Sequence, residues 1–160
     1  MDSKDIVPKD LYRDTPVRYL GYANEVGEAF RAIIGSKLVL ASYGVAVLYV
    51  CADTTDKTIK THQEKSNAPN RIIQTSFTAA DTLIWQMLAS VAIPGYTINR
   101  ICAGSMWFMK KNKAMSKINK APRNMIVAGI GLAVIPLIIH PIDHFVDVLM
   151  DKTLRHYRPQ

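Results

Sequence analysis

The sequence has little of what defines small disulfide-rich, metal-binding or catalytic domains. Its two cysteines, Cys51 and Cys102, are too few for a disulfide scaffold and too far apart for a zinc ribbon. It contains no glycine-rich phosphate loop, nucleophile elbow or pair of catalytic carboxylates. An enzyme is therefore the least supported class of protein, and we predict no catalytic residue, no cofactor and no metal.

Acidic residues are absent from one segment that carries most of the positive charge. The 160-residue chain has a net charge of +7, and residues 110–123 alone contain six basic and no acidic side chains. Residues 1–31, by contrast, contain five basic and six acidic side chains. Six charges without interleaved aromatic residues are a poor signal for nucleic-acid binding, so we expect no nucleic-acid partner.

Charged residues are nearly absent from three long stretches, residues 32–52, 77–109 and 125–142. The first contains only Lys37, whose ammonium can reach outward, and the third has no charge if His140 is neutral. About 20 apolar residues in a helix cross the ~30 Å hydrocarbon layer of a bilayer. A buried helix in the core of a soluble protein is the alternative for each stretch.

Two patterns favour the membrane over a soluble core. The first and third stretches lack the polar face of a soluble amphipathic helix, and charge-rich connectors (residues 53–76 and 110–124) separate the three. We therefore predict an all-α membrane domain, a bundle of about three transmembrane helices with residues 143–160 as a tail. The second stretch is either one kinked helix or two short ones broken at Pro94-Gly95. We expect residues 53–76 to form a solvated loop.

The N-terminal segment, residues 10–31, has the pattern of an amphipathic helix. Asp14 or Thr15 is a suitable N-cap, and Glu28 and Arg31 are spaced for an i, i+3 ion pair. An apolar stripe is formed by Tyr19, Tyr22, Val26 and Phe30. We expect this helix to lie on the bilayer surface or to pack on the bundle.

The distribution of lysine and arginine predicts the orientation. With three spans, residues 110–124 share a side with the N-terminus, and residues 53–76 share the other side with the C-terminus. Basic loops remain on the electrically negative side, which is the cytosol or the mitochondrial matrix. The charged N-terminus does not resemble a cleavable signal, so any organellar address is expected to be internal.

The basic loop is a candidate site for membrane lipid. Each basic residue near an anionic bilayer contributes about 1 kcal/mol of attraction, and cardiolipin is one such lipid. The alternative is a topological signal without a partner. The candidate patch consists of Lys110, Lys111, Lys113, Lys117, Lys120 and Arg123.

Ionisable residues at membrane depth usually need partners. We predict that Arg100 forms a structural clamp with Glu25 and Glu28, joined by charge-assisted hydrogen bonds. At the opposite end, Asp81 is expected near His140 and His144 as an outer polar group. A conduction pathway is the alternative role for these residues. Pro141 distorts the turn between the two histidines, which argues against a metal site there.

Three blocks of sequence are similar to the mitochondrial fission process protein family. They are residues 10–31 (DLYRDTPVRYLGYANEVGEAFR), 88–102 (LASVAIPGYTINRIC) and 138–149 (IIHPIDHFVDVL). The resemblance implies a multi-pass protein of the mitochondrial inner membrane that supports organelle division and inner-membrane integrity. It implies no catalytic residue, and it places the basic loop in the matrix.

Three functional hypotheses follow. The first is a non-enzymatic inner-membrane scaffold that acts through contacts with lipid and with inner-membrane or fission proteins. The second is a small transporter, channel or modulator of proton leak that uses Asp81, Arg100 and His140; a water-filled cavity joining these three would favour it. The third is a soluble helical binding domain, which carbonate extraction would release from membranes.

Overall fold

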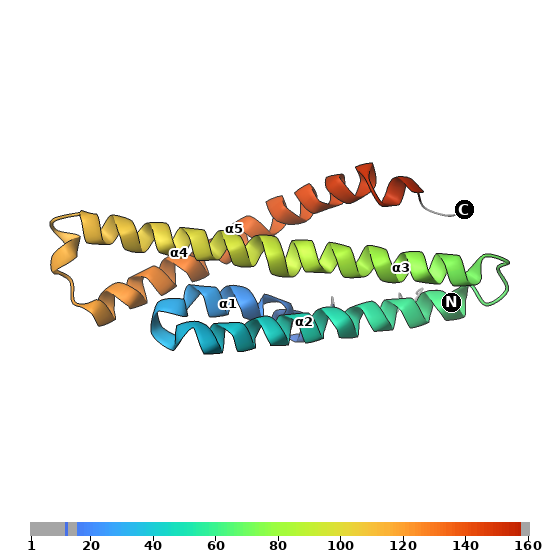
Figure 1. Cartoon of the computed structure of the whole chain (residues 1–160), viewed down its shortest axis with the longest axis horizontal. Coiled ribbons are helices and arrows are strands. Elements are labelled where there is room, and N and C mark those ends of the chain that lie inside the picture. The colour runs from blue at the N-terminus through green and yellow to red at the C-terminus, as the bar shows by residue number, and fades with distance from the viewer. Residues whose placement is uncertain (1–11, 13–15, 158–160) are drawn as a thin grey trace, which may run out of the picture.

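The computed structural model describes residue 12 and residues 16–157, and all regular elements within that part of the chain are helices. Three helical rods are long and apolar enough to cross a membrane. They form an elongated bundle in which the first and second rods run side by side and the third crosses the second at an angle (Figure 1). The prediction of an all-α membrane bundle with three spans is confirmed. The rods are α2 (Arg31–Glu64), α3 (Arg71–Gln86) continued by η2 (Met87–Ala92) and α4 (Ile93–Lys111), and α5 (Lys120–Lys152).

The second rod is one continuous helix rather than two short ones. The segment η2 within it is a π-helix, and Pro94 follows at the start of α4. Proline lacks an amide hydrogen and its ring crowds the preceding turn, and a wider π-turn is one way for a helix to accommodate this. One carbonyl of the π-segment, that of Val91, accepts a 3.0 Å hydrogen bond from Asn24 Nδ2.

The helices extend further than the apolar stretches predict. Residues 53–64 continue α2 and residues 71–76 begin α3, so the expected loop over residues 53–76 is reduced to residues 65–70. Ion pairs at i, i+4 spacing stabilise a helix that has no apolar face, and Asp53–Lys57 is such a pair. The expected tail is likewise helical to Lys152 and ends in the 3₁₀ helix η4 (Arg155–Tyr157).

The N-terminal helical segment folds back along the bundle instead of lying apart from it. The 3₁₀ helix η1 (Pro16–Tyr22) leads into α1 (Ala23–Ala29), and the chain reverses into α2, where Gly35 has a φ of 77°. α1 lies beside α2 and also contacts α4 and α5 (Figure 1). The predicted caps, Asp14 and Thr15, lie outside the described residues.

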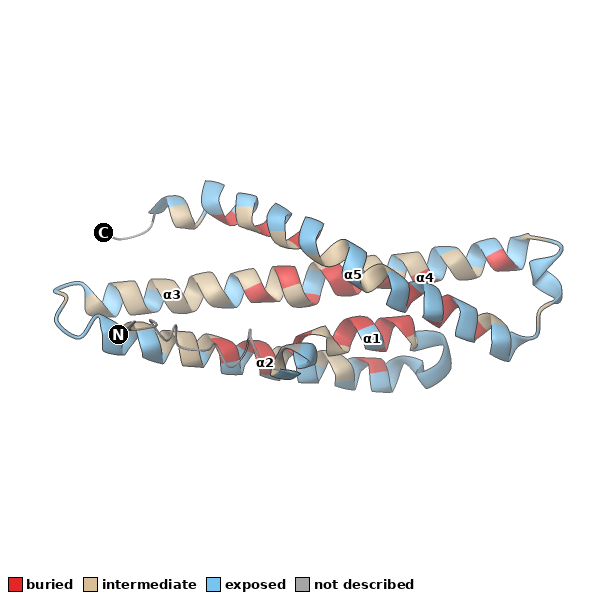
Figure 2. Cartoon of the chain, turned by 180° about the vertical axis from the view of Figure 1, so that it is seen from behind, coloured by how far each residue is buried: buried red, intermediate tan, exposed pale blue. Residues whose placement is uncertain are grey.

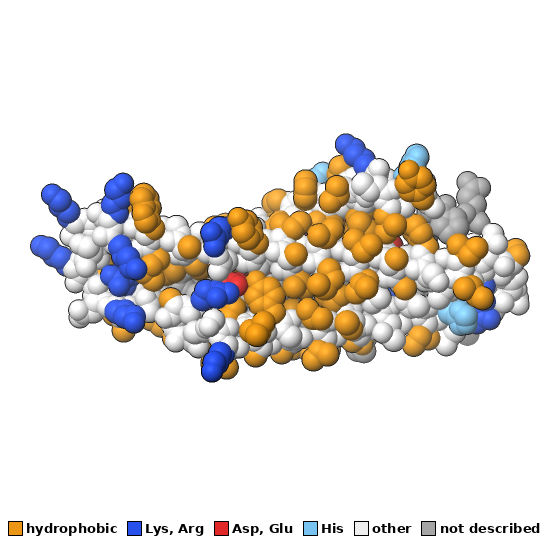
Figure 3. Space-filling view, viewed as in Figure 1, with side chains coloured by type: hydrophobic (Ala, Val, Ile, Leu, Met, Phe, Trp, Pro, Cys, Tyr) orange, Lys and Arg blue, Asp and Glu red, His pale blue; other side chains and the backbone are white. Residues whose placement is uncertain are grey.

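This segment buries the two carboxylates that were predicted to face the bundle and leaves part of its apolar stripe exposed. Asn24, Glu25 and Glu28 are 0–2% exposed, whereas Tyr19 and Val26 of the apolar stripe are 73% and 40% exposed. A soluble helix would bury its apolar face, but in lipid polar side chains turn inward. Buried residues accordingly line the interior of the bundle (Figure 2), and apolar side chains cover much of the outer face in Figure 3.

Candidate functional site

Glu28 joins three helices through one buried carboxylate. Its Oε2 and Oε1 accept hydrogen bonds of 2.7 and 2.6 Å from Nε and Nη2 of Arg31, which confirms the predicted i, i+3 pair. Tyr43 of α2 donates its hydroxyl at 3.0 Å, and Asn99 of α4 donates its amide at 2.9 Å. Because Tyr43 lies in α2 and Asn99 lies in α4, the Glu28 carboxylate fixes α1 against both helices.

The prediction named the wrong cation for the clamp, because Arg31 and not Arg100 donates to Glu28. Arg100 is exposed, and its guanidinium donates to Asn99 Oδ1 at 2.7 and 3.2 Å while lying 5.5 Å from the centre of the Tyr96 ring. Arg31 takes the expected place at Glu28, since it follows Glu28 by one helical turn at the chain reversal. Arg100 reaches Glu28 only through Asn99, which bonds both.

Glu25 lies one turn before Glu28 and in a different environment. Its side chain is fully buried, and neither carboxylate oxygen has a hydrogen-bond partner among the described residues. The clearest electrostatic influence on it is another acid, Asp143 of α5. A buried carboxylate without a partner is costly when ionised, so a proton or a cation must compensate it.

At the far end of the bundle, Arg155 replaces the predicted histidines as the partner of Asp81. Its guanidinium donates to Asp81 Oδ1 at 2.9 Å and to Asp147 and Asp151 at 3.0 Å each. The hydrogen bond that Arg155 donates to Asp81 is the main cause of a raised pKa for Arg155, so this cation persists at any physiological pH. Asp147 also accepts a 2.9 Å hydrogen bond from Trp85 Nε1.

His140 and His144 are both exposed and do not belong to this polar group. They lie one turn apart on α5, and neither lines the pocket to which Asp143 and Asp147 of the same helix contribute. The expectation that they approach Asp81 is therefore corrected. Instead, the chain after α5 turns back and brings Arg155 to α3. The sequence pattern after Lys152 does not predict this return.

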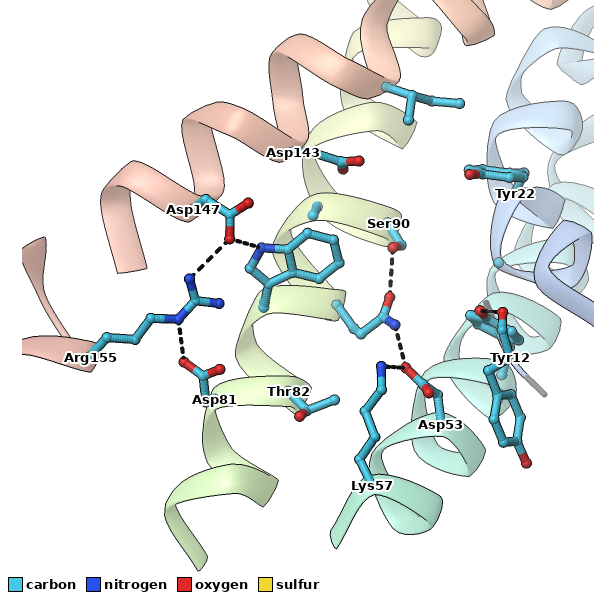
Figure 4. A pocket seen from close by; sticks show the side chains of 16 residues that line it. Tyr12, Tyr22, Asp53, Lys57, Asp81, Thr82, Ser90, Asp143, Asp147 and Arg155 are labelled. Carbon is cyan, nitrogen blue, oxygen red and sulfur yellow. Dashed lines mark hydrogen bonds and ion pairs between the residues drawn. The ribbon is translucent and has the colours of Figure 1, made fainter. Parts of the chain in front are cut away.

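A polar pocket of about 260 Å³ lies between the start of the N-terminal helical segment, α2, α3 and α5. In one wall, Ser90 Oγ donates to Gln86, and Gln86 Nε2 and Lys57 Nζ both donate to Asp53 Oδ2, at 2.5 and 2.8 Å (Figure 4). Asp81, Asp147 and Arg155 lie in another wall. Sequence reasoning missed this pocket, although the Asp53–Lys57 spacing was a usable signal.

The six residues of the predicted lipid patch gather at the other end of the bundle. They lie at the end of α4, in the short connection containing η3 (Met115–Lys117) and at the start of α5. Figure 3 shows basic side chains clustered at this end. Lys111 Nζ lies 4.7 Å from the ring centre of Trp107, and the buried Nε of Arg123 has no partner among the described residues.

No group of three or more His, Cys, Asp or Glu side chains within the described residues has the arrangement of a metal site. Cys51 is exposed and Cys102 is buried, and both are free thiols. Three carboxylates of the pocket, those of Asp53, Asp81 and Asp147, accept hydrogen bonds from Arg155, Lys57 or Gln86, which suits them to joining helices. None of these arrangements provides a nucleophile with an activating base.

Three apolar rods with an internal polar network define the class of this protein, a helical bundle with three helices long and apolar enough to span a membrane. Within that class, the chain belongs to the family described as Mitochondrial 18 KDa protein (MTP18), which matches residues 12–76 and 65–150. This confirms the family resemblance seen in the sequence. No solved structure matches the chain.

Several relatives carry the name mitochondrial fission process protein 1. The human protein is 49% identical over 151 residues, covering 94% of this chain and 89% of the relative. The Caenorhabditis elegans protein is 48% identical over 159 residues, covering 95% and 90%. The Danio rerio protein is 48% identical over 148 residues, covering 92% and 88%.

Proposed function

We propose that this protein is a non-enzymatic, multi-pass protein of the mitochondrial inner membrane that supports fission and inner-membrane integrity through contacts with lipid and other proteins. The names of its relatives support a role in fission. The observation that carries the mode of action is the basic end, where six cations gather on a short connection that contains no acidic residue.

These cations are suited to an anionic bilayer surface. The five lysines are exposed, and Trp107 beside Lys111 is 61% exposed, as expected of a side chain at the boundary between hydrocarbon and headgroups. The positive-inside rule places this end in the matrix, where cardiolipin is the proposed lipid.

A rescue experiment tests this role. Cells depleted of the protein would receive the wild type or a variant with Lys110, Lys111, Lys113 and Lys117 changed to Gln, and mitochondrial length would be measured. We expect the wild type to restore division and the variant to fail. The matched control changes four exposed lysines outside the patch to Gln: Lys37, Lys60, Lys65 and Lys152. Full rescue by the patch variant would remove the basic end from the mechanism.

Localisation is tested separately by protease protection. A cleavage site placed in the connection between α4 and α5 should be protected in intact mitochondria and in mitoplasts, and should be cut only after the inner membrane is permeabilised. Cleavage in intact mitochondria would contradict the inner-membrane assignment. Cleavage in mitoplasts without permeabilisation would contradict the orientation.

The second candidate function is transport or modulation of proton leak, and the polar pocket is the observation in its favour. The pocket includes Asp81, but Arg100 and His140 do not line it and are exposed. This pocket therefore does not join all three residues, although the hypothesis requires a cavity that does. Flux assays in liposomes with the parent protein and the Arg100→Ala variant test it; no flux in the parent protein would end it.

A further inference from the structure

The pocket at the far end of the bundle combines acidic and aromatic walls. Four carboxylates line it against two cations, so its lining carries an excess of two negative charges. Figure 4 shows Asp143 and Tyr22 on opposite sides of the pocket, with Ser90 between them in the view. The aromatic residues of the lining are Tyr12, Tyr22, Tyr49 and Trp85.

Two buried acids at this pocket have unused acceptor oxygens. Asp53 lines it and is fully buried; its Oδ2 binds Lys57 and Gln86, but its Oδ1 has no partner among the described residues. Glu25, with both oxygens unpartnered, lies one helical turn beyond the lining residues Gly21 and Tyr22. Its electrostatic neighbour, Asp143, is itself in the lining.

The chemistry of the walls selects the kind of cation. A divalent metal needs several carboxylates around one point, and no such group is present among the described residues. An ammonium is larger and donates up to three hydrogen bonds, so it can reach acceptors on different helices. Aromatic faces also attract ammonium groups, and aromatic cages are a known mode of recognising them.

The volume suits a small head rather than a large ligand. About 260 Å³ is the space of roughly nine water molecules and lies below the range typical of drug-sized ligands. Trp85 forms part of the lining, and the apolar stretch of α2 ends directly before Asp53. The pocket therefore lies where hydrocarbon gives way to headgroups and water.

We propose that this pocket binds an organic ammonium group, held by Asp53 and Asp143 and surrounded by the tyrosines and Trp85, with the buried carboxyl group of Glu25 behind the lining. Such a group comes either from a phospholipid with an amine headgroup or from a small soluble amine. The site is separate from the basic end and from the proposed action of that end on anionic lipid.

Trp85 provides the readout, because the chain has only two tryptophans. The full chain with Trp107→Phe would be placed in nanodiscs of phosphatidylglycerol, which carries no ammonium group, and Trp85 emission followed during titration with ethanolamine. Parallel nanodiscs would replace part of the phosphatidylglycerol with phosphatidylethanolamine. A saturable change with free ethanolamine identifies a soluble amine, and a change only with phosphatidylethanolamine identifies a lipid headgroup. Either result supports the site.

Two isosteric variants and one control complete the test. Asp143→Asn should weaken the response roughly 10- to 100-fold, as expected for loss of a charge-assisted hydrogen bond. Glu25→Gln should weaken it less, because Glu25 lies behind the lining. Glu64→Gln makes the same kind of change at an exposed position outside the lining and should leave the response unaltered. Helix content and melting temperature would be checked for each variant.

The proposal is overturned by two results. No saturable change with either amine source would mean that a proton, not an ammonium, compensates Glu25. An equal response in the wild type and in both isosteric variants would place the amine elsewhere. Because the first result needs only the Trp107→Phe chain, the proposal remains falsifiable even if the carboxylate variants do not fold.

Discussion

The two ends of the bundle use charge in opposite ways. At the basic end, the cations of residues 110–123 have no acidic residue in their own segment, and the five lysines face outward. At the far end, Asp53 and Lys57 pair, and Arg155 binds three aspartates on two helices. Charge left unpaired at a surface is available to an external partner, whereas charge paired between helices holds the fold together.

This contrast predicts its largest effect for lipid binding. Changing Lys110, Lys111, Lys113 and Lys117 to Gln should weaken binding to cardiolipin vesicles by about 4 kcal/mol, at ~1 kcal/mol per cation. The melting temperature should hardly change, because surface charges contribute little to stability. Co-sedimentation with vesicles and thermal unfolding in detergent measure the two quantities. Binding equal to that of the wild type would show that this end is only a topological signal.

The next effect concerns stability at the far end. Arg155→Ala should lower the free energy of unfolding by about 1–3 kcal/mol, because Asp81 and Asp147 lose a charged hydrogen-bond donor. Lys152→Ala, an exposed change three residues away, is the control and should stay within about 0.5 kcal/mol. Chemical denaturation in mild detergent compares them. Equal stability of the two variants would contradict a structural role for Arg155.

A smaller loss of stability is expected when the contact between α2 and α3 is changed. Gln86→Leu removes the donor to Asp53 Oδ2 but leaves Lys57 in place, so it should destabilise the fold by about 1 kcal/mol. Gln63→Leu, at an exposed position on α2, provides the same change without a buried partner. The same denaturation experiment applies. A neutral or stabilising Gln86→Leu would mean that the buried acid is satisfied without it.

The smallest expected effect is that of salt on the free energy of unfolding, and it distinguishes the two ends of the bundle. Raising ionic strength from 0.01 to 0.15 M shortens the screening length from about 30 to about 8 Å. Vesicle binding through the exposed lysines should therefore weaken, while the unfolding free energy of the protein should shift by less than about 0.5 kcal/mol. A melting temperature that falls steeply with salt would indicate that the far-end pairs are more exposed than they are here.

The apolar stretches predict the architecture because hydrocarbon imposes a simple rule on length and composition. The ends of the helices are less predictable, since Asp53–Lys57 and Asp56–Lys60 stabilise α2 in water without an apolar stripe. Tyr19 and Val26 of the apolar stripe remain exposed because a helix packed on a membrane bundle turns its polar face inward.

Local spacing predicts contacts within a helix but not those between helices. The Glu28–Arg31 pair follows from three-residue spacing, and the structure contains it. The partners of Arg100 and Asp81 depend on how helices rotate against one another, which the sequence pattern does not specify. The pairing of Arg155 with Asp81 can be predicted only when the chain beyond α5 is known to return towards α3.

The π-helical segment between α3 and α4 takes up one extra residue within a 41-residue rod. A regular α-helix turns by about 100° per residue, and the wider turn absorbs the rotation that the extra residue would otherwise add. If the segment became α-helical without losing a residue, everything before it would rotate by about 100° relative to everything after it. Asp81 and Trp85 would then turn away from α5 while Asn99 kept its place beside α1. Deleting one residue from the segment should instead restore a regular helix with both halves facing as they do now, so this local irregularity is what lets both ends of the rod keep their contacts.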